Sequence, residues 1–196
     1  MASSHREISN PFIQSISKNL SSSDEKKRKQ AAVEIDTHIK GLNQRGDTVE
    51  IGEIIKTLAN SFAYSPQNST KKGGLLGMAA VAIGLMGNTN RYLDQLLPPV
   101  LKCFADNESK TRFAACEALY NVAKVARAST IPWFNEIFDG LCKLNTDQDV
   151  DVKNAAHLLN TLMKEIVTES DSEAFDMARF LPMLKERLQH SNPFGE

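Results

Sequence analysis

Apolar residues recur three and four positions apart along most of this 196-residue chain, a spacing that places them on one face of an α-helix. The clearest example is the stretch TRFAACEALYNV at 111–122, in which small and apolar residues share one stripe. Comparable stripes, separated by short polar turns, predict further helices at about 11–20, 24–41, 48–62, 71–86, 93–104, 134–144 and 152–167. The pattern therefore predicts an all-α protein.

A short cassette repeats in every second predicted helix: a cation, one spacer residue and two small residues. The steps between successive small pairs are 42, 41 and 41 residues. A constant period of this size is typical of HEAT and armadillo arrays, whose helical repeats are roughly 40–47 residues long. The four cassettes are Lys29 with Ala31 and Ala32, Lys71 with Gly73 and Gly74, Arg112 with Ala114 and Ala115, and Lys153 with Ala155 and Ala156. We therefore predict an α-solenoid of about four and a half helical hairpins.

This period divides the chain into a disordered N-terminal tail, 1–9, and one solenoid domain, 10–196. The repeats are expected at 10–42, 48–87, 91–127, 131–167 and 174–196. Because the last repeat is only half complete, we expect the chain to be a fragment of a longer solenoid.

The small pairs of the cassette are expected to let neighbouring helices approach closely, because the second helix of each hairpin is flanked on both sides. Close contact also explains Gly73, Gly77 and Gly84, since a glycine inside a helix costs roughly 1 kcal/mol relative to alanine. A phosphate-binding loop is a poor alternative, because no Gly-Lys-Ser/Thr follows these glycines.

The cation of each cassette lies near a helix N-terminus, where the helix dipole disfavours positive charge. Acidic residues in the preceding turns offer compensation: Asp24, Asp106, Asp147 and Asp149. One interpretation is an ion-pair ladder, in which Lys29, Lys71, Arg112 and Lys153 each reach an acid of their own or the adjacent turn. The other is that the cations are simply solvated. Exposed pairs contribute only about 0–1 kcal/mol each, so apolar stacking must hold the array together in either case.

Residues of the second helices that point away from the packed stripe form a candidate partner surface. They are Lys72, Leu76, Phe113, Glu117, Tyr120, Asn121, Lys124, Asn154 and Leu158. For Leu76 and Leu158, packing between repeats is an equally good explanation. The densest positive patch is the run Lys26, Lys27, Arg28 and Lys29, which is either a solvated helix face or a contact for phosphoinositide headgroups or an acidic partner.

The composition narrows the class of function. A net charge of -1 gives no bulk electrostatic case for binding nucleic acid. Three cysteines argue against a disulfide framework, and Cys103, Cys116 and Cys142 are expected in the core. The longest uncharged run, 73–87, is 15 residues and shorter than a membrane span of roughly 20. We therefore expect a soluble intracellular protein.

No catalytic chemistry is visible in the sequence. Its four histidines fit no metal-ligand spacing with the cysteines, and no hydrolase, kinase or metalloprotease signature is present. We therefore expect a protein that is not an enzyme, without a metal or cofactor, that acts by presenting an extended surface.

Five segments closely resemble the N-terminal repeats of the Vac-fourteen family of vacuole-morphology proteins. They are KKGGLLGMAAVAIG (71–84), LLPPVLKCFAD (96–106), RFAACEALYNVAKVAR (112–127), FNEIFDGLCKL (134–144) and KEIVTES (164–170). The first twenty residues match no pattern of that family.

The resemblance implies a non-catalytic HEAT scaffold in the cytoplasm, peripheral on vacuolar or endosomal membranes. It implies direct binding of the phosphatidylinositol-3-phosphate 5-kinase by the N-terminal repeats. In the full complex an opposing phosphoinositide 5-phosphatase would also be held, so that phosphatidylinositol 3,5-bisphosphate is controlled. Self-association and phosphatase binding belong to a C-terminal region that is expected to be absent here. Direct binding of phosphoinositides or a membrane surface is the alternative function.

Overall fold

The computed structural model describes residues 10–170, and every regular element in this range is helical. The predicted tail at 1–9 and the predicted partial repeat at 174–196 lie outside the described residues. The α-helices are α1 (Pro11–Leu20), α2 (Glu25–Arg45), α3 (Thr48–Thr57), α4 (Asn68–Leu85), α5 (Leu93–Lys102), α6 (Ser109–Ala126), α7 (Phe134–Leu144) and α8 (Val150–Glu169). Shorter helical segments join them: the π-helix η1 (Leu58–Ala63) and the 3-10 helices η2 (Met86–Tyr92), η3 (Cys103–Ala105) and η4 (Arg127–Trp133).

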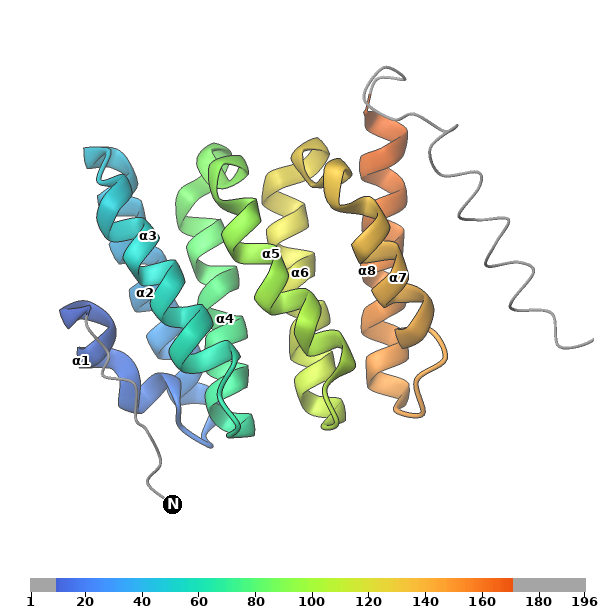
Figure 1. The fold of residues 1–196 in the computed structure, drawn as a ribbon, viewed down its shortest axis with the longest axis horizontal. Coiled ribbons are helices and arrows are strands. Elements are labelled where there is room, and N and C mark those ends of the chain that lie inside the picture. Colours follow the sequence, from blue (N-terminus) through green and yellow to red (C-terminus); the bar gives the residue numbers. More distant parts are fainter. Residues whose placement is uncertain (1–9, 171–196) are drawn as a thin grey trace, which may run out of the picture.

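The helices pair in chain order into four hairpins, laid side by side (Figure 1). The second helices α2, α4, α6 and α8 form one layer, in which each packs on the next. The first helices α3, α5 and α7 form a second layer in front of it in the view of Figure 1. One continuous apolar core runs through the array from Ile13 to Ile166. The prediction of an all-α solenoid of HEAT type is confirmed.

The turns that leave α4 and α6 are built alike. Met86 and Arg127, 41 residues apart, end these helices with φ of 53° and 46°. Three residues later, the buried hydroxyls of Thr89 and Thr130 each donate to the carbonyl oxygen of that positive-φ residue, at 2.7 Å in both turns. Positive φ is costly for residues other than glycine, so the recurring threonine bond compensates for recurring backbone strain.

Glycines mark the points where α4 touches its neighbours. A Cβ atom on Gly73 would lie 1.8 Å from the carbonyl oxygen of Leu20, and one on Gly74 would lie 2.5 Å from the nitrogen of Ala63. A Cβ on Gly77 would meet a methyl of Leu58 at 2.8 Å, and one on Gly84 would meet Ile39 at 2.8 Å. The predicted close contacts at Gly73, Gly77 and Gly84 are confirmed.

The alanine pairs divide into two kinds. Ala31, Ala115 and Ala156 are completely buried, and Ala32 is nearly so. Ala114 and Ala155, in contrast, are only partly buried and pack at the edge of the core. The second residue of each later pair therefore sets the helix-to-helix distance, whereas the first lies at the surface of the layer.

The expectation of three core cysteines was wrong for Cys142, which is exposed. Leu141 and Leu144 of α7 are buried in the core. Successive residues of an α-helix are rotated by about 100°, so Cys142 points toward solvent. Burial raises the pKa of the Cys103 thiol to about 11 and that of Cys116 to about 12. Both buried thiols are therefore protonated and unreactive at neutral pH.

We predict that Gly73→Ala will destabilise the protein by about 3 kcal/mol, because the new methyl would collide with a backbone carbonyl that cannot rotate away. The matched control is Gly52→Ala in α3, where no atom lies within 4 Å of the added Cβ. That change should stabilise by about 0.5–1 kcal/mol through helix propensity. Urea unfolding followed by circular dichroism measures both, and equal effects would contradict the close-contact explanation.

Candidate protein-binding groove

The N-cap residues of the second helices give the true register of the repeats. They are Asp24, Gln67, Glu108 and Asp149, separated by 43, 41 and 41 residues. Counting four residues on from each N-cap reaches a cation in every repeat: Arg28, Lys71, Arg112 and Lys153. The cassette alignment, which placed Lys29 in this set, was therefore wrong by one residue in the first repeat. In the corrected register Ala31 is equivalent to Gly74, Ala115 and Ala156, the small residues that are buried in each helix.

The turn before each second helix is also equivalent from repeat to repeat. Two residues before the N-cap, a short side chain accepts a hydrogen bond from the N-cap N–H. These residues are Ser22, Ser65, Asp106 and Asp147, with bonds of 3.1, 3.2, 3.0 and 3.0 Å. In the third and fourth repeats the acceptor is a carboxylate, which leaves one oxygen free for a second partner.

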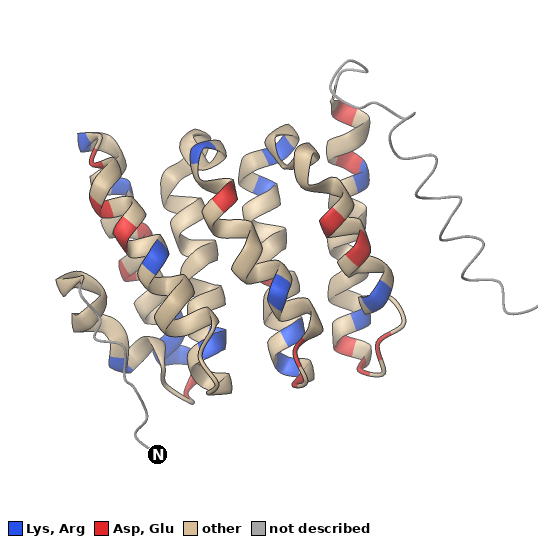
Figure 2. Ribbon diagram, in the orientation of Figure 1, with Lys and Arg blue, Asp and Glu red and all other residues tan. Residues whose placement is uncertain are grey.

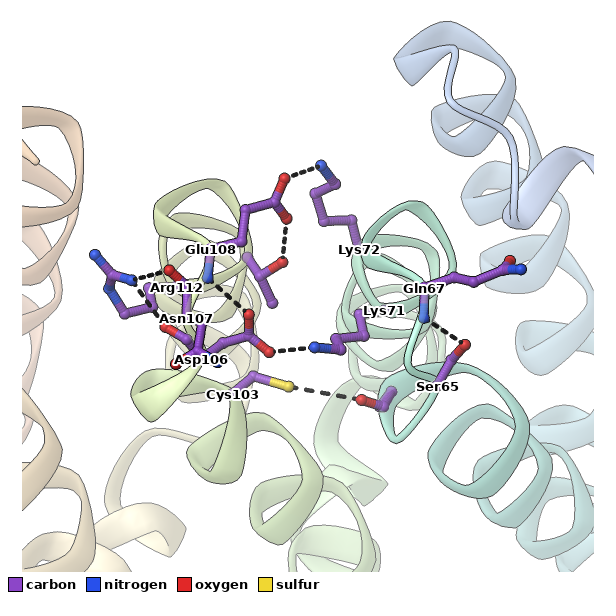
Figure 3. A network of polar contacts seen from close by, with 11 residues as sticks. Ser65, Gln67, Lys71, Lys72, Cys103, Asp106, Asn107, Glu108 and Arg112 are labelled. Carbon is purple, nitrogen blue, oxygen red and sulfur yellow. Dashed lines mark hydrogen bonds and ion pairs between the residues drawn. The ribbon is translucent and has the colours of Figure 1, made fainter. Parts of the chain in front are cut away.

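Two of the cations cross to this carboxylate in the next repeat. Lys71 reaches Asp106 at 2.5 Å, and Arg112 binds both oxygens of Asp147, at 2.6 and 2.8 Å. Figure 3 shows Lys71 pointing from α4 to Asp106, with Lys72 beside it reaching Glu108 at 3.3 Å. Each pair joins one second helix to the turn that precedes the next, so it fixes how adjacent hairpins are stacked.

The remaining members of the predicted ladder lie elsewhere. Lys29 is exposed and pairs with Glu25 of its own helix. Asp24 and Asp149 accept hydrogen bonds from backbone N–H groups as the N-caps of α2 and α8. No ion pair joins Lys153 to a carboxylate of residues 10–170.

The ion pairs lower the pKa values of their carboxylates. The hydrogen bond from Arg112 is the main cause that lowers the pKa of Asp147, and the same bond raises the pKa of Arg112. For Asp106, burial opposes ionisation, but the hydrogen bonds from Lys71 and from the Glu108 N–H outweigh it and lower the pKa. Both carboxylates therefore stay charged well into the acid range.

The other face of the second helices carries a groove. Its first part is a cavity of about 400 Å³ lined by α2, α4 and α6, which includes Arg28, Lys29, Lys72, Leu76, Lys110, Phe113 and Glu117. Residues of α2 and α6 line it together although α4 separates these helices in the layer. Lys29 of α2 and Glu117 of α6 also act on each other electrostatically. The layer is therefore concave on this face.

The second part of the groove is a cavity of about 460 Å³ between α6 and α8. It shares Phe113, Glu117 and Asn121 with the first part, so the two form one continuous groove. Its remaining lining includes Tyr120, Asp151, Asn154, Ala155 and Leu158. Of the nine residues of the predicted partner surface, the structure places eight along this groove; Lys124 lines neither part and is exposed farther along α6.

One row of equivalent positions lies nine residues after each N-cap: Val33, Leu76, Glu117 and Leu158. The last three line the groove, whereas Val33 lies on α2 outside both parts. Val33 is 58 % exposed and Leu158 is 61 % exposed, although both are apolar. The predicted partner surface did not include Val33, because the cassette of the first repeat was aligned one residue too late. Partial burial in the groove raises the pKa of Glu117, an effect that Lys29 opposes. The row therefore offers apolar contacts around a single carboxylate.

The basic run predicted as a lipid contact is largely engaged within the protein. Arg28 is buried and donates to the carbonyl oxygens of Ser22 and Ser23. Lys29 pairs with Glu25. Lys26 and Lys27 are the members of the run that remain exposed without an ion pair to residues 10–170.

Between residues 10 and 170, no cluster of three or more histidine, cysteine or acidic side chains is arranged to hold a metal ion. None of the helices in the same range has the length and hydrophobicity needed to span a bilayer.

Comparison with known proteins gives consistent matches. A family model described as the vacuolar 14 Fab1-binding region matches residues 69–165. The chain is 49 % identical over 179 residues to the Protein VAC14 homolog of Arabidopsis thaliana, a match that covers 91 % of this chain and 24 % of the relative. It is 37 % identical over 217 residues to the vacuole morphology and inheritance protein 14 of Saccharomyces cerevisiae, covering 91 % and 25 %. With the Protein VAC14 homolog of Schizosaccharomyces pombe the identity is 43 % over 162 residues, covering 82 % and 20 %. The chain thus spans about a quarter or less of the length of the curated relatives it matches.

We predict that Asp147→Asn will destabilise the protein by about 2 kcal/mol at pH 7, because Arg112 loses a charged, two-pronged partner that is only 7 % exposed. The pKa of Asp147 is lowered on folding, so its stabilisation is present above the unfolded value of about 4 and is lost as the pH falls through the lower folded value. The difference between the variant and the native protein should therefore shrink at acid pH.

The control for this prediction is Glu25→Gln, which removes the exposed pair with Lys29 and should leave the stability nearly unchanged at every pH. Urea titrations at pH 7, 5, 4 and 3 measure both variants. A cost for Asp147→Asn that does not change with pH would show that the pair does not contribute through its charge.

Proposed function

Because this chain belongs to the VAC14 family, we propose that it is a non-catalytic scaffold segment that binds the lipid kinase Fab1 through the concave groove of its second helices. The proposal rests on one observation: the region matched by the family model contains the residues of the predicted partner surface. The Fab1-binding region of the family matches residues 69–165, which include nearly all of α4, α6 and α8. All nine residues of the predicted partner surface fall within these limits.

The chemistry of the groove suits a protein segment. Its floor is apolar, formed by Leu76, Phe113 and Leu158, and this kind of surface forms the centre of most interfaces. Polar side chains that can orient a partner surround the floor, among them Asn121 and Asn154. Leu158 lines the groove and is 61 % exposed although it is apolar, which is consistent with burial by another protein.

The two ends of the groove differ in charge. Lys29, Lys72 and Lys110 line the part between α2 and α6, whereas Asp151 lines the part between α6 and α8. A kinase segment that carries carboxylates at one end and a cation at the other would match both parts. Such complementarity fixes the direction in which the segment lies and speeds association.

The complex of kinase and phosphatase concerns the full-length proteins of the family. We propose that the complete scaffold holds the phosphatidylinositol-3-phosphate 5-kinase together with an opposing 5-phosphatase and so regulates phosphatidylinositol 3,5-bisphosphate. Self-association would use parts of the full-length protein beyond this chain. The complex would place the chain on the cytoplasmic side of vacuolar or endosomal membranes as a peripheral component.

Direct phosphoinositide binding is the second candidate. It rests on Lys26 and Lys27, the members of the basic run that are exposed and form no ion pair with residues 10–170. The neighbouring cations of α4, Lys71 and Lys72, are 18 % and 19 % exposed and paired with Asp106 and Glu108. Two exposed lysines give weak attraction to an anionic surface, about 1 kcal/mol each, so kinase binding is the better supported function.

We predict that Leu158→Glu will weaken binding of purified Fab1 kinase at least tenfold, because a carboxylate would be buried in an apolar part of the interface. The measurement is biolayer interferometry with the immobilised chain and no lipid. The matched control is Val49→Glu, since Val49 is 72 % exposed but lies on α3, outside the groove. Loss of binding in the control alone would place the kinase on the first helices.

The same chain tests the second candidate. If kinase binding is the function of these repeats, Lys26→Glu with Lys27→Glu should leave kinase affinity within twofold of the native value. Sedimentation with vesicles that contain phosphatidylinositol 3,5-bisphosphate should show little binding by the native chain. Strong sedimentation that is abolished by the double change would instead favour the membrane surface.

A further inference from the structure

One ion pair of the ladder is missing, between the first and second repeats. Arg28 stands at the position that Lys71 and Arg112 occupy in the next two repeats. The carboxylates that receive those two cations, Asp106 and Asp147, have Ser65 as their equivalent in the turn before α4. The first repeat therefore has the cation of the ladder, and the second repeat carries a hydroxyl at the position of the acid.

Arg28 is already held in the geometry that Arg112 uses. Its Nη1 donates to the carbonyl oxygens of Ser22 and Ser23, at 2.7 and 2.9 Å. The Nη1 of Arg112 donates to the equivalent carbonyls of Asp106 and Asn107, at 2.8 and 3.2 Å. Arg112 then directs its Nε and Nη2 to Asp147. Arg28 is 8 % exposed and forms no salt bridge with a carboxylate of residues 10–170.

Ser65 has the surroundings of a phosphoacceptor. Pro66 follows it directly, and a serine before proline is the acceptor that proline-directed protein kinases recognise. The residue before a proline is restricted to extended backbone, the conformation in which kinases bind their substrates. The turn is accessible, since Tyr64, Pro66 and Gln67 are exposed on either side of the half-buried serine.

Positive charge lies near Ser65 from the second repeat as well. Ser65 lines a cavity of about 390 Å³ together with Lys71, Lys102 and Asp106. Lys71 is committed to Asp106, and Lys102 lies 4.6 Å from the centre of the Tyr64 ring. Lys102 of α5 thus adds positive charge on this side of Ser65, which favours the negative charges of a phosphate there in addition to the pairing with Arg28.

We infer that Ser65 is a phosphorylation site, and that its phosphate completes the ladder by pairing with Arg28. In the reaction the Ser65 Oγ forms a bond to the γ-phosphorus of ATP while the bond from that phosphorus to the β–γ bridging oxygen breaks. The hydroxyl proton passes to the base of the modifying kinase, and ADP leaves. The new pair would tie α2 to the turn before α4 as Asp147 ties α6 to the turn before α8.

The consequence concerns the shape of the groove. Lys29 and Val33 lie on α2, so fixing α2 against α4 also fixes these side chains relative to Lys72 and Leu76. Phosphorylation would therefore fix the relative positions of side chains that line the first part of the groove. Any effect on Fab1 binding rests on the function proposed above. The test below uses stability and modification alone, so its outcome does not depend on that function.

The first experiment compares melting temperatures of Ser65→Asp and Ser22→Asp. Both changes place a carboxylate two residues before an N-cap, where it can accept a hydrogen bond from the N-cap N–H. They differ in the possible ion pair, because no second helix with a cation precedes Ser22 in residues 10–170. Ser65→Asp should raise the melting temperature by about 2–4 °C more than Ser22→Asp does, as expected for one additional partly buried ion pair in a chain of this size. The extra gain should vanish in the background of Arg28→Met, which keeps the apolar stem of the side chain.

An equal effect of the two aspartates, or a gain that persists with Arg28→Met, would overturn the proposed pairing. Should Arg28→Met fail to fold, Arg28→Lys provides the background, and the extra gain should fall by at least half because lysine cannot bind in two-pronged fashion.

The second experiment incubates the folded chain with a proline-directed protein kinase and ATP and maps the phosphate by mass spectrometry. We expect modification of Ser65 and a rise in melting temperature at least as large as that of Ser65→Asp. Modification of a peptide that spans residues 60–70 without modification of the folded chain would overturn the assignment of Ser65 as an acceptor. Phosphorylation that lowers the melting temperature would overturn its role in the ladder.

Discussion

The close approach of each second helix to the helices around it is the contact on which the rest of the structure depends. A carbon atom added at Gly84 of α4 would overlap Ile39 of α2, and one added at Gly73 or Gly74 would overlap Leu20 of α1 or Ala63 of η1. Ala31, Ala115 and Ala156 have no exposed surface. Small side chains let α2, α4, α6 and α8 lie in one layer, which brings the larger apolar residues between the layers into one continuous core. Burial of that core supplies the stability, since each fully buried Leu or Ile contributes about 1.5–3 kcal/mol.

The ion pairs have a different role, which is to determine alignment. Lys71 with Asp106 joins α4 to the turn before α6, and Arg112 with Asp147 joins α6 to the turn before α8, at the same end of the array. Figure 2 shows Lys and Arg gathered at that end of α2, α4 and α6, close to the acidic turns that precede α6 and α8. Apolar packing tolerates sliding, whereas a two-pronged pair with a carboxylate requires one geometry. The pairs thus set the relative position of hairpins that the apolar core holds together, and with it the line of side chains across the groove.

Much of this arrangement could be predicted from the sequence, because the 41-residue period is visible in residue types. The helices, the close glycine contacts and the two cations that cross to Asp106 and Asp147 all follow from it. The first repeat could not be aligned correctly, since Ala31 and Ala32 are both small and both largely buried, so either could match Gly74. The N-cap residues resolve the ambiguity only in three dimensions. They show a first step of 43 residues, where α2 continues to Arg45 and the π-helix η1 extends α3. This correction replaces Lys29 with Arg28 in the ladder and aligns Val33 with Leu76, Glu117 and Leu158.

If the groove binds the kinase, the second helices form the binding side of the molecule and the first helices pack behind them. Lysine-reactive crosslinking of the chain to Fab1 kinase, mapped by mass spectrometry, tests this directly, because both layers carry lysines in the free protein. The account predicts crosslinks from Lys29, Lys72, Lys110 and Lys124 on α2, α4 and α6, with few from Lys56, Lys102 and Lys143 on α3, α5 and α7. Crosslinks concentrated on the second of these sets, with the first left unmodified, would contradict it.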